Sequence, residues 1–522
     1  LKAYLSHLPL FQGLPDEEMQ ALSEIAVDHP VKAGEMIFID GERAAGLNIV
    51  MAGRVKIFKL SPNGKEQILH IMGPGEPFAE VPVGTPQHVD EAVAAARAAF
   101  PAWSALSHAE RRDRLLKLAG ALEANMPELM QLLTQETGKP MGGYNGTGSG
   151  MEVGGSMAWM QATAATELAV EVVQDDEVAR VEVHRKPIGV VGSITPWNWP
   201  LMIAVWHYAP ALLAGNTVVA KPSEYTPVAT LRFAELANEI LPPGVLNVVA
   251  GDGAVGAAIA AHDDINKIVF TGSSGTGRAI MEAAAGNLKR LTLELGGNDA
   301  GIVLPDVDVK AVAPKLFGVC FHNNGQTCQA LKRLYVHESI YDELCAELVK
   351  LAEKVKVGNG LEEDTELGPL QNARQLNIVR ELAADARAAG ATFLTGGEES
   401  GGPGYFYPPT IVTNISDGTR LVDEEQFGPI VPVIKYSDVD DAIARANASS
   451  AGLGGSIWSS DLETAARLVE RLEAGSVWVN THADIQPNAP MGGMKQSGIG
   501  CEFGHWGLEE NTDIQTVKIN KS

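Results

Sequence analysis

The sequence has few cysteines and few basic residues, and each shortage excludes a class of protein. Four cysteines in 522 residues, without C-x-x-C spacing or a histidine cluster beside them, predict neither a disulfide framework nor a metal site. Free thiols are typical of a reducing compartment, so we expect a cytoplasmic protein. Lys and Arg number 40 against 65 Asp and Glu, a formal net charge of −25. This balance disfavours a nucleic-acid partner, which requires a basic face.

Long apolar runs are also scarce. The longest weakly charged run, residues 201–220, has the length of a membrane span, but Pro210, Gly215 and Asn216 interrupt it and His207 lies inside it. It therefore predicts a buried helix, a turn and a strand, and no membrane partner. The first residues, LKAYLSHLPLFQG, carry no secretory-signal pattern, and because they begin with Leu the natural start of the protein stays open.

The chain contains two regions with different patterns. Up to about residue 80, one or two short helices precede short strands, with SPNGKE between two alternating runs as in a hairpin, which predicts a small all-β unit. From about residue 85, Ala-rich helical segments alternate with apolar, β-branched runs such as IGVVGSI, NTVVAKP and KIVFTG. This alternation predicts an α/β fold with parallel sheets of the doubly wound type. A chain of this length predicts two to four domains.

Cys328 lies in the polar, glycine-containing segment FHNNGQTCQA, whereas Cys320 ends the apolar run LFGVC. A nucleophilic thiolate requires access and nearby hydrogen-bond donors, which such a loop supplies. Cys320 is expected to be a small core residue. From the spacing alone, a functional and a structural role for Cys328 stay equally open.

Two further segments place polar side chains after apolar strands. TPWNWP would present Asn198, whose amide group is able to stabilise an oxyanion. LTLELGGND ends a strand with Glu294 beside two glycines, which allow a close approach of other groups. Taken singly, each segment is better explained as a helix or turn cap.

Taken together, the segments carry a resemblance. TPWNWP, AGNTVVAKPSE, FTGSSGTG, LELGGND, NNGQTC, EEQFGPI and PMGGMKQSGIG occur in this order, and residues 81–522 closely resemble the aldehyde dehydrogenase superfamily. The resemblance implies a Rossmann-like NAD domain at 81–295 with an oligomerisation hairpin at about 168–186. A catalytic domain at 296–490 and a C-terminal return with an oligomerisation strand at 491–522 would follow, in a homodimer or homotetramer.

The resemblance also implies the reaction and its catalytic residues. Cys328 would attack the carbon of a small-molecule aldehyde, and Asn198 and the Cys328 N–H would hold the oxyanion. After hydride transfer to NAD, Glu294 would activate the water that releases the carboxylic acid from the thioester. Members that pass the acyl group to coenzyme A tend to lack this glutamate, so its presence favours hydrolysis.

The cofactor site is implied by the same motifs. Lys221 and Glu224 correspond to the pair that binds the adenosine ribose, and because a carboxylate there repels a 2′-phosphate, NAD is favoured, with NADP as the alternative. Ser273 corresponds to the pyrophosphate contact at a helix start. The other implied cofactor residues are Thr195, Trp197, Ser223, Gly253, Leu295, Glu425 and Phe427.

One motif points elsewhere. Gly251, Gly253 and Gly256 form a literal GxGxxG after a strand, the pattern of many dinucleotide sites. Since the phosphates lie near FTGS in the family that the chain resembles, we interpret this GxGxxG as structural.

The substrate tunnel is implied only by position. An apolar tunnel suits an aliphatic or aromatic aldehyde, and no basic residue in these positions marks a carboxylate-bearing substrate. The implied tunnel residues are Trp199, Met202, Trp206 and Met491, with Asp484 and Ile485 in a neighbouring variable loop.

Residues 1–80 resemble part of the β-roll of the cyclic-AMP receptor family, at Gly34 and Glu35, at GRV and at GPGEPFAE. The arginine that would grip a cyclic phosphate and the helix-turn-helix do not follow, so we expect neither cyclic-nucleotide nor DNA binding. Two alternatives to an active dehydrogenase stay open. One is a ligand-sensing regulatory fusion, and the other is an impaired dehydrogenase scaffold whose N-terminal strands are replaced.

Overall fold

The protein is described here from a computed structural model of the whole chain. The structure describes residues 2–6, 16–32, 35, 37, 48–53, 55–60, 66–72, 77–78, 83–399, 401 and 404–521. The chain forms two compact units, Leu1–Val83 and Gly84–Ser522.

In its described residues, the first unit contains two short helices and four short strands. Leu5 of α1 (Lys2–Leu5) and Met19 of α2 (Asp16–Ile25) are buried together. The strands form two antiparallel pairs, β1 (Asn48–Ile49) with β4 (Pro77–Phe78) and β2 (Val55–Leu60) with β3 (Glu66–Met72). The β2–β3 pair confirms the hairpin predicted around SPNGKE, whose turn lies outside the described residues. Much of the expected β-roll lies outside them too, and the described strands form two separate ladders.

The second unit contains two sheets of mainly parallel strands, as the alternating sequence pattern predicts. The first has the order β21-β11-β10-β7-β8-β9, and only β21 is antiparallel. Since the chain leaves β9 at one edge and returns as β10 beside β7, the order reverses between β7 and β10, where sheets of this kind bind ligands. The strands are β7 (Val190–Ile194), β8 (Thr217–Lys221), β9 (Leu246–Val248), β10 (Lys267–Thr271), β11 (Arg290–Glu294) and β21 (Gly498–Ile499).

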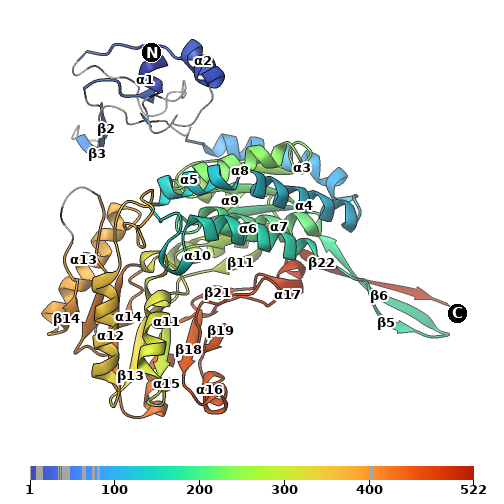
Figure 1. The fold of residues 1–522 in the computed structure, drawn as a ribbon. Coiled ribbons are helices and arrows are strands. Elements are labelled where there is room, and N and C mark those ends of the chain that lie inside the picture. The colour runs from blue at the N-terminus through green and yellow to red at the C-terminus, as the bar shows by residue number, and fades with distance from the viewer. Residues whose placement is uncertain are drawn as a thin grey trace. The chain divides into compact units, whose positions relative to one another are not determined.

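Helices cover both faces of this sheet (Figure 1). The helices of one face are α4 (His108–Ala124), α5 (Met126–Thr137), α6 (Ser149–Ala164), α7 (Pro200–Ala214) and α8 (Val228–Asn238). Those of the other face are α3 (Pro86–Ser104), α9 (Gly253–Ala261) and α10 (Ser274–Ala284). Strands covered on both faces are apolar throughout, which is why these runs do not alternate.

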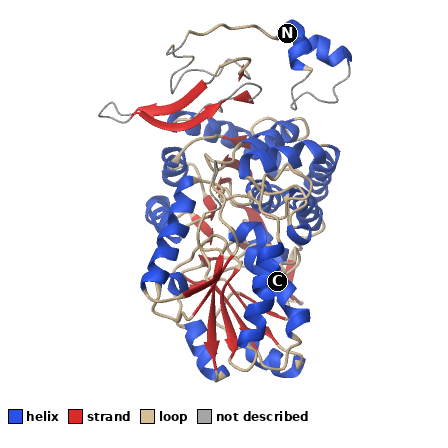
Figure 2. Cartoon of the chain, turned by 60° about the vertical axis from the view of Figure 1, so that its left-hand side comes forward, coloured by secondary structure: helices blue, strands red, loops and turns tan. Residues whose placement is uncertain are grey.

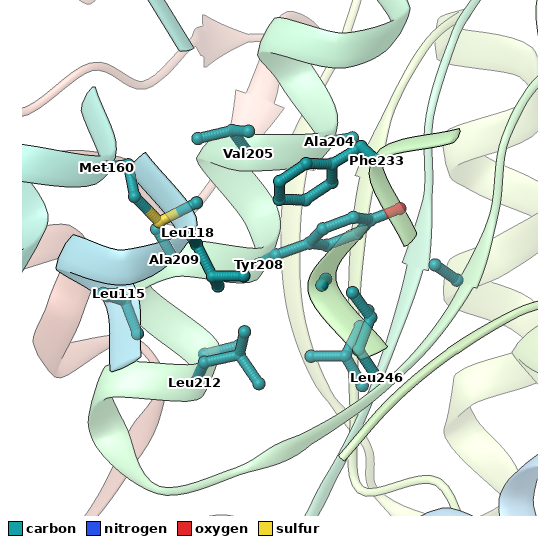
Figure 3. Packing of buried hydrophobic residues seen from close by; sticks show 14 of the residues in the cluster. Leu115, Leu118, Met160, Ala204, Val205, Tyr208, Ala209, Leu212, Phe233 and Leu246 are labelled. Carbon is teal, nitrogen blue, oxygen red and sulfur yellow. The ribbon is translucent and has the colours of Figure 1, made fainter. Parts of the chain in front are cut away.

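Helix α7 accounts for the run that has the length of a membrane span. Pro200 opens the helix, and Gly215, with φ at 99°, ends it in the left-handed region before β8. Its side chains are almost all buried in the core of the first sheet, where the Tyr208 ring stacks beside Phe233 (Figure 3). The predicted helix, turn and strand are therefore confirmed. None of the helices in the described part of the chain combines the length and apolar character of a membrane span.

The second sheet has the order β14-β15-β16-β13-β12-β18-β19, and only β14 is antiparallel. Figure 2 shows its strands between helices. The strands are β12 (Asp299–Val303), β13 (Leu331–His337), β14 (Thr392–Thr395), β15 (Thr410–Thr413), β16 (Ile430–Tyr436), β18 (Gly454–Trp458) and β19 (Ser476–Val479). The main helices are α11 (Val309–Phe321), α12 (Tyr341–Lys354), α13 (Ala373–Ala388), α15 (Val439–Asn447) and α16 (Leu462–Val469).

A third, antiparallel sheet projects as an arm from the second unit (Figure 1). It joins β5 (Glu171–Asp175), β6 (Ala179–Pro187) and β22 (Thr512–Asn520), and β6 and β22 pair over nine residues each. These strands lie in the segments for which the resemblance implies an oligomerisation hairpin and a C-terminal oligomerisation strand. Exposed apolar side chains on and beside them are Val170, Val172, Val173, Val178, Ile514 and Ile519.

The connection between the two large sheets sets the position of the site. Strand β11 ends at Glu294 and β12 begins at Asp299, so four residues carry the chain from one sheet to the other. The carboxyl end of the first sheet therefore meets the amino end of the second. Side chains from both sheets converge where these ends face each other.

Candidate active site

Cys328 is held by a tight turn between α11 and β13. The turn η4 (His322–Gly325) places three successive residues in the left-handed region, Asn323 at φ 49°, Asn324 at 56° and Gly325 at 75°. Asn tolerates this conformation, and Gly325 is required because a Cβ there would lie 2.2 Å from the Gly428 carbonyl oxygen. The turn delivers Cys328 half-buried, at the facing ends of the two sheets.

Asn198 reaches the same turn from the end of β7. Its Nδ2 donates to the Gln326 carbonyl at 3.1 Å, and the neighbouring Trp199 Nε1 donates to Thr327 Oγ1 at 3.2 Å. The Cys328 N–H has no acceptor among the described residues. The Asn198 amide and this free N–H are thus both available where an oxyanion on the Cys328 adduct would form.

A buried ion pair fixes Asn198. Lys139 Nζ donates to Glu152 Oε2 at 2.5 Å and to the Asn198 carbonyl at 2.7 Å, and it lies 3.6 Å from the centroid of the Trp199 ring. The other oxygen of Glu152 accepts the N–H groups of Leu201 and Met202 at 3.0 and 3.3 Å, in the first turn of α7. Both charged side chains are fully buried. The pair therefore holds both the Asn198 peptide and the start of the helix that follows it.

Glu294 ends β11 close to the Cys328 backbone. A Cβ at Gly297 would lie 2.3 Å from the Cys328 carbonyl oxygen, so only glycine allows this approach of β11 to the turn. Glu294 is buried, and neither of its carboxyl oxygens has a hydrogen-bond partner among the described residues. Burial, with a smaller contribution from the charge of Glu502, holds the pKa of Glu294 well above its usual range.

Glu502 is a second buried carboxyl group, and its charge acts on Glu294. Burial raises its pKa to about 8. His207 Nε2 lies 3.4 Å from Glu502 Oε1, but the ring nitrogens also contact Ser193 Oγ at 2.8 Å and Thr271 Oγ1 at 3.0 Å. Burial, and secondarily Lys267, lowers the pKa of His207 to about 3, so the imidazole is neutral and does not compensate the carboxylate.

The sequence analysis missed Glu502, Lys139 and Glu152 as site residues and noted His207 only as an interruption of an apolar run. The signals were slight. A glutamate stands among glycines in GIGCEFG, and Lys139 stands in a GKP segment. No local pattern shows that these residues meet Glu294 and Asn198, because each contact joins distant segments.

The electrostatic surroundings of Cys328 differ from the sequence-based expectation. We expected donors that favour the thiolate, but burial, followed by the charges of Glu425, Asp299 and Glu294, raises the pKa of the thiol. Only the backbone N–H of Gln329 acts in the opposite direction. Contrary to this expectation, the resting side chain of Cys328 is therefore a protonated thiol. It becomes a nucleophile only when a base takes its proton.

The residues expected to bind the cofactor gather at the carboxyl edge of the first sheet. Lys221 ends β8, and its Nζ lies 3.3 Å from Glu224 Oε2. Ser273 caps α10, with its Oγ accepting the Thr276 N–H at 3.3 Å, so the helix N-terminus opens at this edge. The remaining expected residues follow three strands: Thr195 and Trp197 after β7, Ser223 after β8 and Leu295 after β11.

The segment just before β16 packs against this edge. Glu425 Oε1 accepts the Gly297 N–H at 3.1 Å, and burial raises the pKa of Glu425 to about 7. Phe427 has φ at 48°, a strained conformation for an aromatic residue, and its ring meets the Trp197 ring edge-on at 5.3 Å. Residues that are expected to bind one cofactor thus lie side by side, although they come from segments that adjoin different sheets.

The GxGxxG segment opens α9. Gly253 is the first residue of the helix, after the cap Asp252, whose side chain accepts the Ala254 N–H at 2.8 Å. A Cβ at Gly256 would lie 3.5 Å from Lys221 Cδ, so the start of α9 adjoins the Lys221 side of the edge.

The structure brings the four expected tunnel residues into one buried cluster. Trp199, Met202, Trp206 and Met491 pack with Ile203 and Phe503, and Met151, Trp159 and Ile485 pack against them. We call these nine residues the indole cluster. Asp484 lies outside it, in the lining of a cavity of about 540 Å³ that also includes Tyr144 and His322, whose ring meets the Trp199 ring edge-on at 5.0 Å.

Comparison with known proteins identifies the family that this arrangement matches. The family model described as aldehyde dehydrogenase family matches residues 63–517. It begins inside the region that the sequence analysis assigns to a β-roll, before the expected boundary at residue 81.

Two curated relatives are similar over most of their length. Betaine aldehyde dehydrogenase from Bacillus subtilis is 40% identical over 467 residues, covering 87% of this chain and 95% of that protein. Phenylacetaldehyde dehydrogenase from Pseudomonas fluorescens is 40% identical over 470 residues, covering 87% and 93%. The solved NAD⁺ complex of aldehyde dehydrogenase from Bacillus cereus has a TM-score of 0.83 and 36% identity, covering 90% of this chain and 94% of that one.

Proposed function

Because the chain belongs to the aldehyde dehydrogenase family and oxidises an aldehyde with NAD, we propose that Cys328 is the nucleophile, Asn198 the oxyanion donor and Glu294 the general base. The observation that carries this assignment is their convergence on one turn. Asn198 Nδ2 binds the backbone two residues before Cys328, and Gly297 brings the end of β11 against the Cys328 carbonyl.

The first half of the reaction forms the covalent adduct. Cys328 Sγ attacks the carbonyl carbon, and its proton leaves to a base, since the thiol is protonated at rest. Glu294 is a suitable acceptor because its raised pKa makes it a stronger base than an exposed carboxylate. The Asn198 amide and the Cys328 N–H donate to the oxygen of the resulting thiohemiacetal.

The second half releases the acid. Bound NAD supplies the acceptor for the hydride of the thiohemiacetal carbon. The acyl group then remains on Cys328 as a thioester. Glu294 first releases to solvent the proton that it took from Cys328, and it then takes a proton from the water that attacks the thioester. As the carboxylic acid leaves, Glu294 gives this second proton to Sγ, so Cys328 is again a thiol and Glu294 again a carboxylate.

The cofactor edge fits a dinucleotide. Thr195 Oγ1 is buried there without a partner among the described residues, and the α10 N-terminus offers backbone N–H groups for phosphate oxygens. We assign Lys221 and Glu224 to the adenosine ribose, Ser273 to the pyrophosphate and Glu425 to the nicotinamide ribose. The other lining residues are Thr195, Trp197, Ser223, Gly253, Leu295 and Phe427. The Glu224 carboxylate disfavours a 2′-phosphate, so NADP is the weaker alternative.

The proposal extends to assembly and location. Apolar side chains exposed along the β5-β6-β22 arm support a homodimer or homotetramer. The two large sheets support the division into an NAD domain at 81–295 and a catalytic domain at 296–490, with 491–522 returning to the arm. Four free cysteines support a reducing, cytoplasmic location.

For residues 1–80 we keep the partial β-roll as a proposal. It is supported by the sequence resemblance and by the β2–β3 hairpin. A regulatory fusion as the main function is not favoured, because the family match extends from residue 63 to 517 and the catalytic residues are all present.

The test is NADH formation with a panel of alkanals and aromatic aldehydes. Cys328→Ala should abolish turnover, because no other group forms the thioester. Cys320→Ala is the matched control, since Cys320 is buried in the α11 core eight positions earlier and should stay active. Turnover by Cys328→Ala would contradict the assignment of the nucleophile.

A further inference from the structure

The indole cluster contains polar groups that its packing does not satisfy. Trp199 Nε1 donates to Thr327 Oγ1, but the N–H groups of Trp159 and Trp206 are buried and have no acceptor among the described residues. Burying a donor without a partner destabilises the folded protein, because the donor loses its hydrogen bonds to water. Two such donors in one apolar cluster indicate that their acceptor is a group outside the chain.

Buried indoles elsewhere in the described part of the chain are satisfied. Trp103 Nε1 donates to the Leu212 carbonyl at 3.2 Å, and Trp458 Nε1 donates to Ser456 Oγ at 2.9 Å. Trp159 and Trp206 are the two exceptions among the described residues. The lack of acceptors is therefore confined to the cluster beside the reacting residues.

The two free donors lie close together. Trp159 comes from α6 and Trp206 from α7, and their ring centroids are 5.6 Å apart. Phe503 packs edge-on against both rings, at 5.5 and 4.9 Å. The two free donors thus belong to neighbouring rings of one cluster.

The cluster is continuous with the catalytic residues on two sides. Trp199 directly follows Asn198, and Met491 pairs through its backbone with Glu502, at 2.9 and 2.7 Å. The tail of an aldehyde whose carbonyl is bound at Cys328 and Asn198 therefore has this cluster as its apolar surroundings.

We infer that the preferred substrate is an aldehyde whose apolar tail carries an uncharged oxygen acceptor, such as an ether or ketone oxygen, which the Trp159 and Trp206 N–H groups bind. This inference rests on the proposed function and specifies its substrate class. The acceptor is uncharged because the cluster residues are uncharged and the His322 ring, 5.0 Å from the Trp199 ring, is neutral, since burial lowers the pKa of His322 to about 4. The buried Lys139 over Trp199 is already bound by Glu152, so a carboxylate in the tail would remain uncompensated.

The experiment compares ω-methoxyalkanals with plain alkanals of the same number of heavy atoms, over tails of four to eight carbons. The measured quantity is the ratio of kcat/KM for the two members of each pair on the same enzyme preparation, which cancels the fraction of active enzyme. We expect the ether to be preferred by about tenfold at the tail length that places its oxygen at the indoles.

Trp206→Phe and Trp159→Phe remove the N–H and keep an aromatic ring, so each should lower this ratio, and the double variant should bring it close to one. Trp103→Phe is the matched control, because it removes a satisfied indole N–H outside the cluster and should leave the ratio as in the wild type.

A wild-type ratio near one at every tail length would overturn the inference, as would an ether preference that survives in the double variant. Either result leaves the proposed function intact as long as alkanals yield NADH. Absence of NADH with every aldehyde would instead overturn the proposed function, and the inference with it.

Discussion

Two buried pairs of ionisable groups border the Cys328 turn, and they are arranged in opposite ways. On the Asn198 side, Lys139 and Glu152 carry opposite charges and satisfy each other and the neighbouring backbone. On the Glu294 side, Glu294 and Glu502 are like groups whose carboxyl oxygens have no hydrogen-bond partners among the described residues.

The difference indicates a separate role for each of the two pairs. An ion pair in which each group is bonded to its partner and to the backbone has a fixed geometry, which suits a group that must position an oxyanion donor. Two carboxyl groups without hydrogen-bond partners have raised pKa values, so each is a stronger base than an exposed carboxylate, which suits a general base. The pair on the Asn198 side of Cys328 is therefore assigned to positioning the oxyanion donor, and the pair on the Glu294 side to proton transfer.

The largest expected effect comes from removing the base. Glu294→Gln keeps the shape of the side chain but cannot accept a proton, so steady-state turnover should fall by about a thousandfold. If the thioester still forms, rapid-quench experiments should show an acyl-enzyme that accumulates. Turnover within a few-fold of the wild type would contradict the role of Glu294 and, with it, the contrast between the two pairs.

The next effect concerns the pair of Lys139 and Glu152. Lys139→Met leaves Glu152 as an uncompensated buried charge and should lower the free energy of unfolding by about 3–5 kcal/mol, measured in urea. The double variant Lys139→Met/Glu152→Gln should recover much of this stability.

Activity should not recover in parallel with stability, because the double variant still lacks the bond from Lys139 to the Asn198 carbonyl. The pre-steady-state rate of acylation should stay low while the hydrolysis rate changes less. Arg111→Met is a matched control: Arg111 is a buried cation that donates to the Leu213 carbonyl at 2.8 Å, near the opposite end of α7, and its loss should affect stability without this kinetic split.

The smallest effect is a shift in pH dependence. Glu294 acts as a base only when it is unprotonated, so kcat should rise with pH through its raised pKa. The negative charge of Glu502, present above a pKa of about 8, raises the pKa of Glu294 further. Glu502→Gln removes that charge, so the alkaline end of the rise should move to lower pH by about one unit.

The kcat–pH profile checks this shift, with Glu353→Gln on the exposed face of α12 as the control that should leave the profile unchanged. A profile for Glu502→Gln that matches the wild type would show that burial alone sets the basicity of Glu294.

Local sequence patterns predicted the parts of the fold that depend on short-range physics. The apolar runs that became β7, β8 and β10 and the interrupted run that became α7 are all found at the expected places. Each could be predicted because strand burial and the effects of proline and glycine depend on residues that are close together in the sequence. Near the N-terminus, the hairpin was predictable for the same reason.

Other features required contacts between distant segments. The free energy of a buried carboxyl group depends on what else is buried beside it, and neither the Glu502 neighbour of Glu294 nor the Lys139 partner of Glu152 is marked by spacing. The same holds for the raised pKa of Cys328, which reverses the expectation from its polar loop.

The sequence by itself determined the strands, the helix caps and the glycines without which the Cys328 turn and the Gly297 approach would clash, because sterics and hydrogen bonding are local. Only the tertiary structure decided which ionisable groups received an opposite charge, which received a like one and which indole N–H groups received no acceptor. Those outcomes depend on dielectric surroundings and partners that distant segments supply when the two sheets meet.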